Sequence, residues 1–202
     1  MVSEAHHVSD DARLDLRTAR VLCIDENSQG LDILGQILMG FGVESTMRAQ
    51  SEADARQLLA ANPFDLVLVD AGLGGNGHAF VRWLRTSPLE PNRYAPVLVL
   101  SGFTPRSQVE SARDCGSSFV VTKPISARTL LDRICWVGRS GRLFVEADSY
   151  CGPDRRFKNE GVAGGGPGRR KTDLSAEVGE ATEPNLSQDE IDNLMKPRKS
   201  AL

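Results

Sequence analysis

Short apolar runs separated by segments of helical periodicity are the feature that most constrains this fold. From Ala19 onward, five such runs alternate with segments in which apolar residues recur every three or four positions. This alternation is typical of an α/β protein with a parallel sheet. Several runs are apolar at every position, as expected for strands that helices cover on both faces. The predicted strands are residues 21–24, 43–47, 66–69, 97–100 and 119–121.

Predicted amphipathic helices follow these strands. In the first, Leu31, Leu34, Leu38 and Phe41 form one apolar stripe, and Gly42 marks the helix end. Four further helices are expected, with apolar positions near residues 55–59, 80–84, 109–112 and 130–136. Five βα units predict a flavodoxin-like, doubly wound sheet of five parallel strands. In such a sheet the functional groups lie at the carboxyl ends of the strands.

The chain of 202 residues is long enough for one core of ordinary size with additional segments. Its glycines concentrate near residues 152–168, which separates a compact part from a loose one. Residues 144–150 are predicted to add a short strand, and the tail beyond is expected to be largely disordered. The expected divisions are a disordered arm 1–17, a compact domain 18–138, an arginine-rich and glycine-rich extension 139–172, and an acidic tail 173–202 with a short amphipathic helix 187–196.

Several classes of protein are disfavoured by the composition. No apolar run approaches the roughly 20 residues that a membrane helix needs, and the amino terminus lacks the pattern of a secretory signal. We therefore expect a cytoplasmic protein without membrane insertion. The four cysteines contain no CxxC pair, which favours reduced and mostly buried thiols over a zinc site or a disulfide framework.

Polar residues follow the predicted strands at the edge where parallel strands end together. Asp25 and Glu26 follow the first strand, Asp70 ends the third, Ser101 the fourth and Lys123 the fifth. Carboxylates from two strands can hold a Mg²⁺ ion that keeps several waters and bridges to a phosphate. A lysine ammonium beside them would stabilise charge on a phosphoryl group moving to Asp70, and a serine hydroxyl would hydrogen-bond it.

The sequences CIDEN, LVLVDAG, LVLSG and VVTKP carry these residues in order. Over residues 18–138 the chain thereby resembles the response-regulator receiver family of two-component signalling, to which the CheY-like proteins belong. Singly, a DE pair is commonly a solvated turn and a KP pair a strand end, but the four together favour the family. The resemblance implies an Asp70 phosphoacceptor assisted by Ser101 and Lys123, a Mg²⁺ pocket of Asp25, Glu26, Asp70 and the Gly72 carbonyl, and no enzymatic activity beyond self-phosphorylation and self-dephosphorylation of Asp70.

Two positions depart from the pattern of that family. Gly74 stands four residues after the acceptor, where family members usually have proline. Val120 stands three residues before the lysine, where they usually have tyrosine or phenylalanine, and Phe119 is displaced by one. A displacement of one residue along a strand turns a side chain to the opposite face. The usual aromatic switch is therefore expected to be absent, and phosphorylation is either vestigial or read out differently.

Two arginine pairs flank the glycine-rich segment of the extension. Guanidinium groups bind phosphates bidentately and stack on purine faces, so an arm with two arginine clusters can close around a small polyanion. The alternative is a solubilising linker. The segment YCGPDRRF is similar to the extension of the Cle class of CheY-like cyclic di-GMP effectors from flagellated alphaproteobacteria, more than to the PilZ signature. This resemblance implies a dinucleotide site of Tyr150, Asp154, Arg155, Arg156, Arg169 and Arg170.

The sequence NLSQDEIDNLMK near the carboxyl terminus predicts a capped helix. Ser187 and Glu190 form a capping box, and Leu186 with Ile191 forms a hydrophobic staple. One face is apolar and the other acidic, which is common in helix-in-groove recognition. The segment also resembles the amino-terminal peptide of the flagellar switch protein FliM. We expect it to dock on its own receiver or on another one, the alternative being a capped helix without a partner.

These observations favour a signalling adaptor that binds cyclic di-GMP and acts on flagellar motor or chemotaxis proteins, with recruitment to the motor. The alternative is a single-domain response regulator that a histidine kinase switches through Asp70, without dinucleotide binding. A third hypothesis, electrostatic nucleic-acid binding, is disfavoured. The basic arm is short, an acidic tail follows it, and no recognition helix is present.

Overall fold

The computed structural model describes residues 15–139, 143–147, 150–154 and 185–196. Most of the amino-terminal arm, the arginine-rich extension and the acidic tail lie outside these residues. The predictions for those segments therefore stay predictions.

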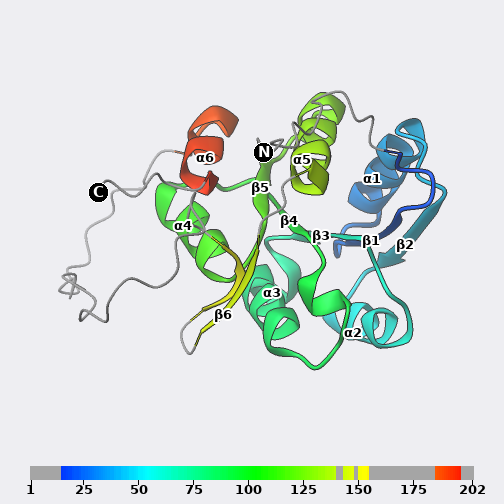
Figure 1. Ribbon diagram of the computed structural model, residues 1–202. Helices are drawn as coiled ribbons and strands as arrows, with labels where there is room; N and C mark the ends of the chain where they lie inside the picture. Colours follow the sequence, from blue (N-terminus) through cyan, green and yellow to red (C-terminus); the bar gives the residue numbers. More distant parts are fainter. Residues whose placement is uncertain (1–14, 140–142, 148–149, 155–184, 197–202) are drawn as a thin grey trace, which may run out of the picture.

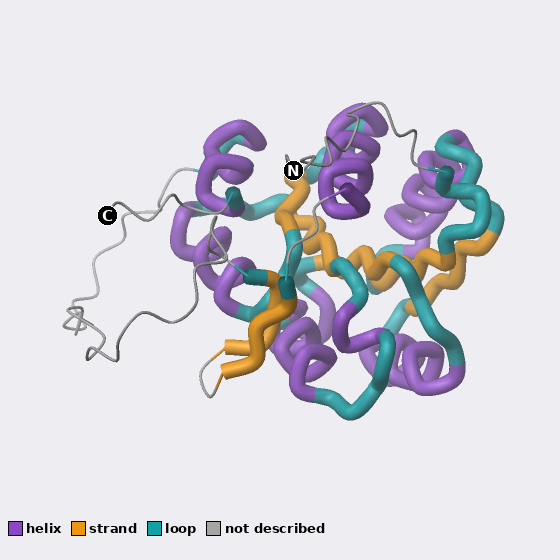
Figure 2. The backbone as a smooth tube through the Cα atoms, in the orientation of Figure 1, coloured by secondary structure: helices purple, strands orange, loops and turns teal. Residues whose placement is uncertain are grey.

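The centre of the molecule is a sheet of five parallel strands in the order β2-β1-β3-β4-β5 (Figure 1). Helices α1 and α5 lie over one face of the sheet and α2 and α3 over the other, as the tube in Figure 2 also shows. This is the flavodoxin-like fold that the sequence predicted. The strands are β1 (Arg20–Ile24), β2 (Ser45–Ala49), β3 (Leu66–Asp70), β4 (Val97–Ser101) and β5 (Phe119–Thr122). The helices are α1 (Ser28–Gly40), α2 (Glu52–Ala61), α3 (Gly77–Thr86), α4 (Arg106–Asp114) and α5 (Ala127–Arg139), with short 3₁₀ turns η1 (Leu73–Gly75) and η2 (Asn92–Tyr94).

The core forms where the apolar runs are longest. Every residue of β4 is buried, and so are the first four residues of β3 and the last four of β1. Of the two edge strands, β2 is only partly buried, whereas the first three residues of β5 are buried. This gradient explains why the central strands read as continuous apolar runs, since helices cover them on both faces.

The prediction for the second strand was wrong by two residues, because β2 begins at Ser45 rather than at Val43. Val43 instead belongs to the end of α1. Its amide donates to the Leu38 carbonyl, and the amide of Gly42, whose φ is +88°, donates to the Met39 carbonyl. These two hydrogen bonds form a Schellman motif, in which the apolar residue after the glycine packs back on the helix. A buried valine therefore marks a helix stop here, although it reads as a strand start.

Two strands follow α5, rather than the single one predicted over residues 144–150. β6 (Phe144–Ala147) and β7 (Tyr150–Pro153) pair as an antiparallel hairpin, which lies against α3. The hairpin is anchored on Arg85, whose guanidinium lies 5.4 Å from the Phe144 ring and whose carbonyl accepts from Cys151 Sγ. The start of the extension is thus packed on the compact domain.

Arg85 is fully buried, which the sequence did not suggest. Its guanidinium donates to the carbonyls of Gly116, Arg93 and Ala95. Burial lowers the pKa of Arg85 to about 10, so the side chain stays charged near neutral pH. Backbone carbonyls, rather than a carboxylate, stabilise this buried cation.

The predicted terminal helix is confirmed as α6 (Gln188–Met195), with Ser187 as its N-cap and the capping box with Glu190 in place. It lies against α4 and β5 (Figure 1). No helix among the described residues is long and apolar enough to cross a membrane.

All four cysteines are free, as predicted. Only Cys23 and Cys115 are buried, whereas Cys135 and Cys151 are partly exposed, so the expectation of mostly buried thiols holds for half of them. Burial raises the pKa of the Cys23 thiol to about 12 and that of Cys115 to about 11, which makes these two unreactive.

Candidate phosphoacceptor site

Three charged residues converge at the carboxyl ends of the strands. Asp25 follows β1, Asp70 ends β3, and Lys123 follows β5. Lys123 Nζ donates to Asp25 Oδ2 at 2.8 Å and to Asp70 Oδ1 at 2.6 Å. One cation therefore bridges two carboxylates from different strands. The sequence predicted that these three residues would meet at this edge, but not that the lysine would bridge the carboxylates.

The bridge is partly sheltered from water. The side chain of Asp25 is 5% exposed, that of Asp70 20% and that of Lys123 31%. Burial by itself lowers the pKa of Lys123, but the hydrogen bonds to Asp25 and Asp70 and the negative charges of these residues together outweigh it, and the pKa lies above its ordinary value. The lysine is therefore protonated throughout the physiological range.

The other oxygens of the two carboxylates are held by nearby backbone amides. Asp70 Oδ2 accepts from the Gly72 amide at 2.7 Å, and Asp25 Oδ1 accepts from the Asn27 amide at 2.9 Å. Such local turns are common for aspartate and fix the side-chain orientation. The Gly72 carbonyl accepts from the Gly75 amide at 2.8 Å, and its second lone pair is available to another ligand.

Glu26 contacts the loop after β3. Its Oε1 accepts from the Gly74 amide at 2.8 Å, which ties the acidic pair to the loop after β3. In the part of the chain that the structure describes, no three His, Cys, Asp or Glu side chains are close enough to hold a metal together. Two carboxylates with water nevertheless suit Mg²⁺, which usually keeps several waters and uses one or two protein carboxylates. The donor set fits such an ion and not an all-protein cage.

Ser101 lies at the predicted strand end, but its hydroxyl is engaged locally. Ser101 Oγ donates to the Phe103 carbonyl at 2.6 Å and accepts from the Phe103 amide at 3.2 Å. Phe103 is 51% exposed. The hydroxyl proton therefore bonds the loop between β4 and α4 and not Asp70.

The aromatic residue displaced in the sequence, Phe119, lies in the interior. It is 1% exposed, packs edge-on against Trp136 at 4.7 Å between ring centres, and lies under the Arg133 guanidinium. Val120, at the position of the usual aromatic switch, is also buried. Neither side chain has the half-exposed environment that a rotating aromatic needs.

Only part of the predicted dinucleotide site falls on described residues. The Tyr150 hydroxyl donates to the Pro153 carbonyl at 2.7 Å, and the Asp154 amide donates to the Leu143 carbonyl at 2.7 Å. Both residues thus shape the β6–β7 hairpin. The predicted arginines Arg155, Arg156, Arg169 and Arg170 lie outside the described residues.

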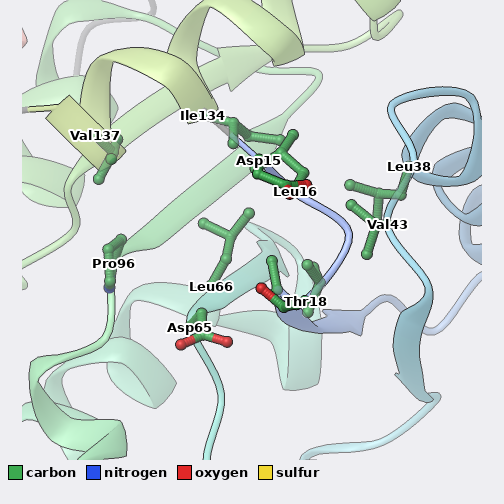
Figure 3. A pocket seen from close by; sticks show the side chains of 13 residues that line it. Asp15, Leu16, Thr18, Leu38, Val43, Asp65, Leu66, Pro96, Ile134 and Val137 are labelled. Carbon is green, nitrogen blue, oxygen red and sulfur yellow. The ribbon is translucent and has the colours of Figure 1, made fainter. Parts of the chain in front are cut away.

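A separate cavity of about 350 Å³ lies at the other end of the sheet, where the strands begin. Its walls are mainly apolar, with Asp15 and Asp65 at the rim (Figure 3). Its lining does not include Asp25, Asp70 or Lys123, and no sequence pattern indicated it. The labelled apolar side chains around it are Leu16, Leu38, Val43, Leu66, Pro96, Ile134 and Val137.

A doubly wound sheet with two aspartates and a lysine at its carboxyl edge defines the receiver class of signalling domain. The family model for the response regulator receiver domain matches residues 21–135, which is more than half of the chain. This protein belongs to the response regulator receiver family.

Curated relatives agree with this assignment. The polar-differentiation response regulator DivK of Brucella ovis is 26% identical over 118 residues, which cover 58% of this chain and 94% of DivK. The response regulator PleD of Caulobacter vibrioides is 29% identical over 124 residues, 61% of this chain and 26% of PleD. The sensory/regulatory protein RpfC of Xanthomonas campestris is 29% identical over 133 residues, 64% of this chain but only 18% of RpfC. The similarity thus concerns the receiver domain and a small part of the larger proteins.

Solved structures show the same fold. The chemotaxis response regulator CheY4 of Vibrio cholerae superposes with a TM-score of 0.54 at 22% identity, covering 59% of this chain and 98% of that one. The CheY-like receiver domain of Methylobacillus flagellatus gives a TM-score of 0.53 at 21% identity, with 59% and 98% coverage. The residues beyond the receiver are outside these similarities.

Proposed function

We propose that this chain is a CheY-like signalling adaptor that accepts a phosphoryl group on Asp70 from a histidine kinase. The observation that supports it is the Lys123 bridge between Asp25 and Asp70, which brings together the cation and the carboxylates that phosphoryl transfer needs. In this proposal the protein catalyses nothing beyond phosphorylation and dephosphorylation of its own Asp70.

In the proposed step an Asp70 oxygen forms a bond to phosphorus while the phosphorus–nitrogen bond of a phosphohistidine breaks. The imidazole leaves with the electron pair and takes up a proton. Lys123 pairs with the phosphoryl oxygens, and Ser101 donates to one of them after it releases the Phe103 carbonyl. Asp25, Glu26, Asp70 and the Gly72 carbonyl would hold a Mg²⁺ ion, which would neutralise part of the phosphoryl charge.

Beryllofluoride, a phosphoryl analogue, tests this proposal directly. We expect the intact chain to bind it with Mg²⁺, as followed by ¹⁹F NMR, and Asp70→Asn to lose the bound signal. Asn193→Ala is a matched control, since Asn193 is exposed on α6. An intact chain that binds no beryllofluoride would mean that the acceptor site is vestigial.

A second function, cyclic di-GMP binding through the arginine-rich extension, is favoured by the way the extension starts. The bond from the Asp154 amide to the Leu143 carbonyl closes the β6–β7 hairpin, which packs on α3, immediately before Arg155. Beside this point is a hollow of about 240 Å³ with aromatic walls, which suits the face of a purine. Its aromatic residues are Tyr94, Trp136 and Phe144. In this proposal the loaded, cytoplasmic adaptor is recruited to the flagellar motor and acts on switch or chemotaxis proteins.

Calorimetric titration separates the two functions. We expect cyclic di-GMP to bind the full-length chain with micromolar or tighter affinity and to lose binding when Arg155, Arg156, Arg169 and Arg170 are changed to alanine. Asp70→Asn should bind the dinucleotide unchanged. No binding by the intact protein would eliminate this function and leave the phosphoacceptor proposal in place.

A further inference from the structure

The loop that carries Ser101 is held by the carboxyl-terminal segment of the chain. Thr104, three residues after Ser101, donates its amide to Asn185 Oδ1 at 3.0 Å and its hydroxyl to the Leu186 carbonyl at 3.1 Å. The Thr104 carbonyl accepts from the Leu186 amide at 2.8 Å. Three hydrogen bonds therefore join residues 185–186 to this loop.

The same segment also holds the end of β5. The Gln188 side chain accepts from the Thr122 amide at 2.9 Å and donates to the Val120 carbonyl at 2.9 Å. Thr122 immediately precedes Lys123, the residue that bridges the two aspartates. In the proposed function, a phosphoryl group on Asp70 would contact Ser101, Lys123 and Mg²⁺. The segment thus contacts the chain close to the first two of these.

Apolar and ionic contacts complete the docking. Ile191 is 0% exposed and Met195 3%, and both belong to the core of the receiver. Asp192 forms an ion pair with Arg133 of α5, with side-chain exposures of 9% and 17%. Residues 185–196 therefore cover one face, which we call the tail-docking face: Thr104, the outer edge of β5, and Arg133.

The hydrogen bond that Ser101 donates is linked to the tail-docking face, because the Ser101 hydroxyl has only one proton to donate. A serine hydroxyl has one proton, so Ser101 cannot donate to the Phe103 carbonyl and to a phosphoryl oxygen at once. If Ser101 donates to a phosphoryl group on Asp70, it loses its bond to the Phe103 carbonyl, which shapes the loop over residues 101–103. Thr104, the next residue, makes its three bonds to the docked segment in the loop shape that this bond maintains.

We propose that residues 185–196 are an intrachain ligand of the tail-docking face, and that occupation of the Asp70 pocket releases them. This inference rests on the proposed phosphoacceptor function. In this proposal, release of residues 185–196 signals that Asp70 is phosphorylated. The usual aromatic switch cannot do so here, because Val120 stands in its place. Coupling between two sites is reciprocal, so the segment when docked weakens phosphoryl-analogue binding by the factor by which the analogue weakens docking.

Two amides report docking from opposite sides of the contact. The Leu186 amide is bonded to Thr104, and the Thr122 amide to Gln188. On adding Mg²⁺ and beryllofluoride to the full-length protein, we expect hydrogen exchange at both amides to accelerate by about tenfold. The Val67 amide, bonded to Pro96 inside the sheet, should be unchanged and serves as the internal control.

The reverse direction uses Ile191→Asp, which places a charge at a fully buried position and should undock the segment. We expect beryllofluoride to bind this variant about tenfold more tightly than the unaltered chain, and Asn193→Ala to match the unaltered chain. A labelled peptide of residues 184–197 should bind Ile191→Asp, whose face is vacant, and bind the unaltered chain at least tenfold more weakly. The tethered segment competes there at an effective concentration on the order of millimolar.

The outcomes are distinguishable. If beryllofluoride binds but the Leu186 and Thr122 amides exchange at the same rate, the coupling is wrong and the phosphoacceptor function stands. The same holds if Ile191→Asp binds the analogue no more tightly. If neither the unaltered chain nor Ile191→Asp binds beryllofluoride, the proposed phosphoacceptor function fails, and the coupling fails with it.

Discussion

At the scale of single residues, the bridge formed by Lys123 sets the charge balance of the site. Its ammonium lies within hydrogen-bonding distance of one oxygen of Asp25 and one of Asp70. Those oxygens are also among the natural ligands of a magnesium ion. Lysine and metal therefore attract the same carboxylates and, being both positive, repel each other.

Removing the lysine should strengthen Mg²⁺ binding. In Lys123→Ala the two carboxylates lose their cation, and we expect the Mg²⁺ dissociation constant to fall by about tenfold, or about 1.4 kcal/mol. Lys123→Arg keeps the charge and is the control. Calorimetric titration of Mg²⁺ measures the effect, and weaker binding by Lys123→Ala would show that the lysine does not compete with the ion.

The buried imidazole of His78 makes the stability of the fold depend on pH. Burial, followed by the nearby Arg82, lowers the pKa of this imidazole below its ordinary value of 6.5. The unfolded chain therefore binds more protons than the folded one as pH falls through about 6.5, and stability decreases in that direction. The slope from one group is at most about 1.4 kcal/mol per pH unit, and partial solvent access makes it smaller.

We expect His78→Gln to lose less stability than the unaltered chain between pH 7.5 and pH 5.5. Urea unfolding at the two pH values measures the difference. Carboxylates that titrate in the same interval contribute equally to both proteins and cancel in the comparison. An identical loss in both would remove His78 as a source of the pH dependence.

At the scale of elements, the β6–β7 hairpin depends on close backbone contact at one glycine. Gly116 has φ +92°, and a Cβ there would lie 2.3 Å from the Cys151 carbonyl oxygen. Only glycine fits such a conformation and approach without strain. The hairpin could not be placed from the sequence, because its anchors are Gly116 and the buried Arg85, which read as an ordinary turn and an exposed helix end.

Gly116→Ala should therefore loosen the hairpin in addition to straining its own backbone. The strain alone is about 1–3 kcal/mol. Gly75→Ala is the matched control, because Gly75 also has positive φ, +78°, but nothing lies within 4 Å of its Cβ position. We expect faster hydrogen exchange at the Asp154 amide in Gly116→Ala only, and equal exchange in both variants would argue against the contact.

At the scale of the whole molecule, the sequence predicted the features that follow from apolar periodicity and from the residues at the strand ends. The sheet and the placement of Asp25, Asp70 and Lys123 followed from apolar runs and the residues after them. The engagement of Ser101 with Phe103 did not follow, since it depends on the shape of one loop. The partners of the terminal segment 185–196, Thr104 and Thr122, also could not be predicted, because long-range polar contacts leave no periodic pattern.

The molecule should show two levels of stability. The sheet is held by a continuous core, whereas residues 185–196 are held by one face and can open locally without unfolding the rest. In native-state hydrogen exchange with added urea, we expect the Leu186 amide to exchange at lower urea than the Val67 amide. Leu68→Ala, at a fully buried position in β3, should destabilise the sheet by about 2–5 kcal/mol. Exchange of the Leu186 and Val67 amides at the same urea concentration would show a single cooperative unit instead.

The position of Gln188 at β5 has a consequence for solubility. β5 is an edge strand, and its outward donors and acceptors can pair with a strand from another molecule. The Gln188 amide satisfies the Val120 carbonyl and the Thr122 amide with a side chain that cannot propagate the sheet. The terminal segment therefore blocks this edge against intermolecular strand pairing. A chain that lacks the segment presents an open edge and is expected to aggregate more readily as its concentration rises.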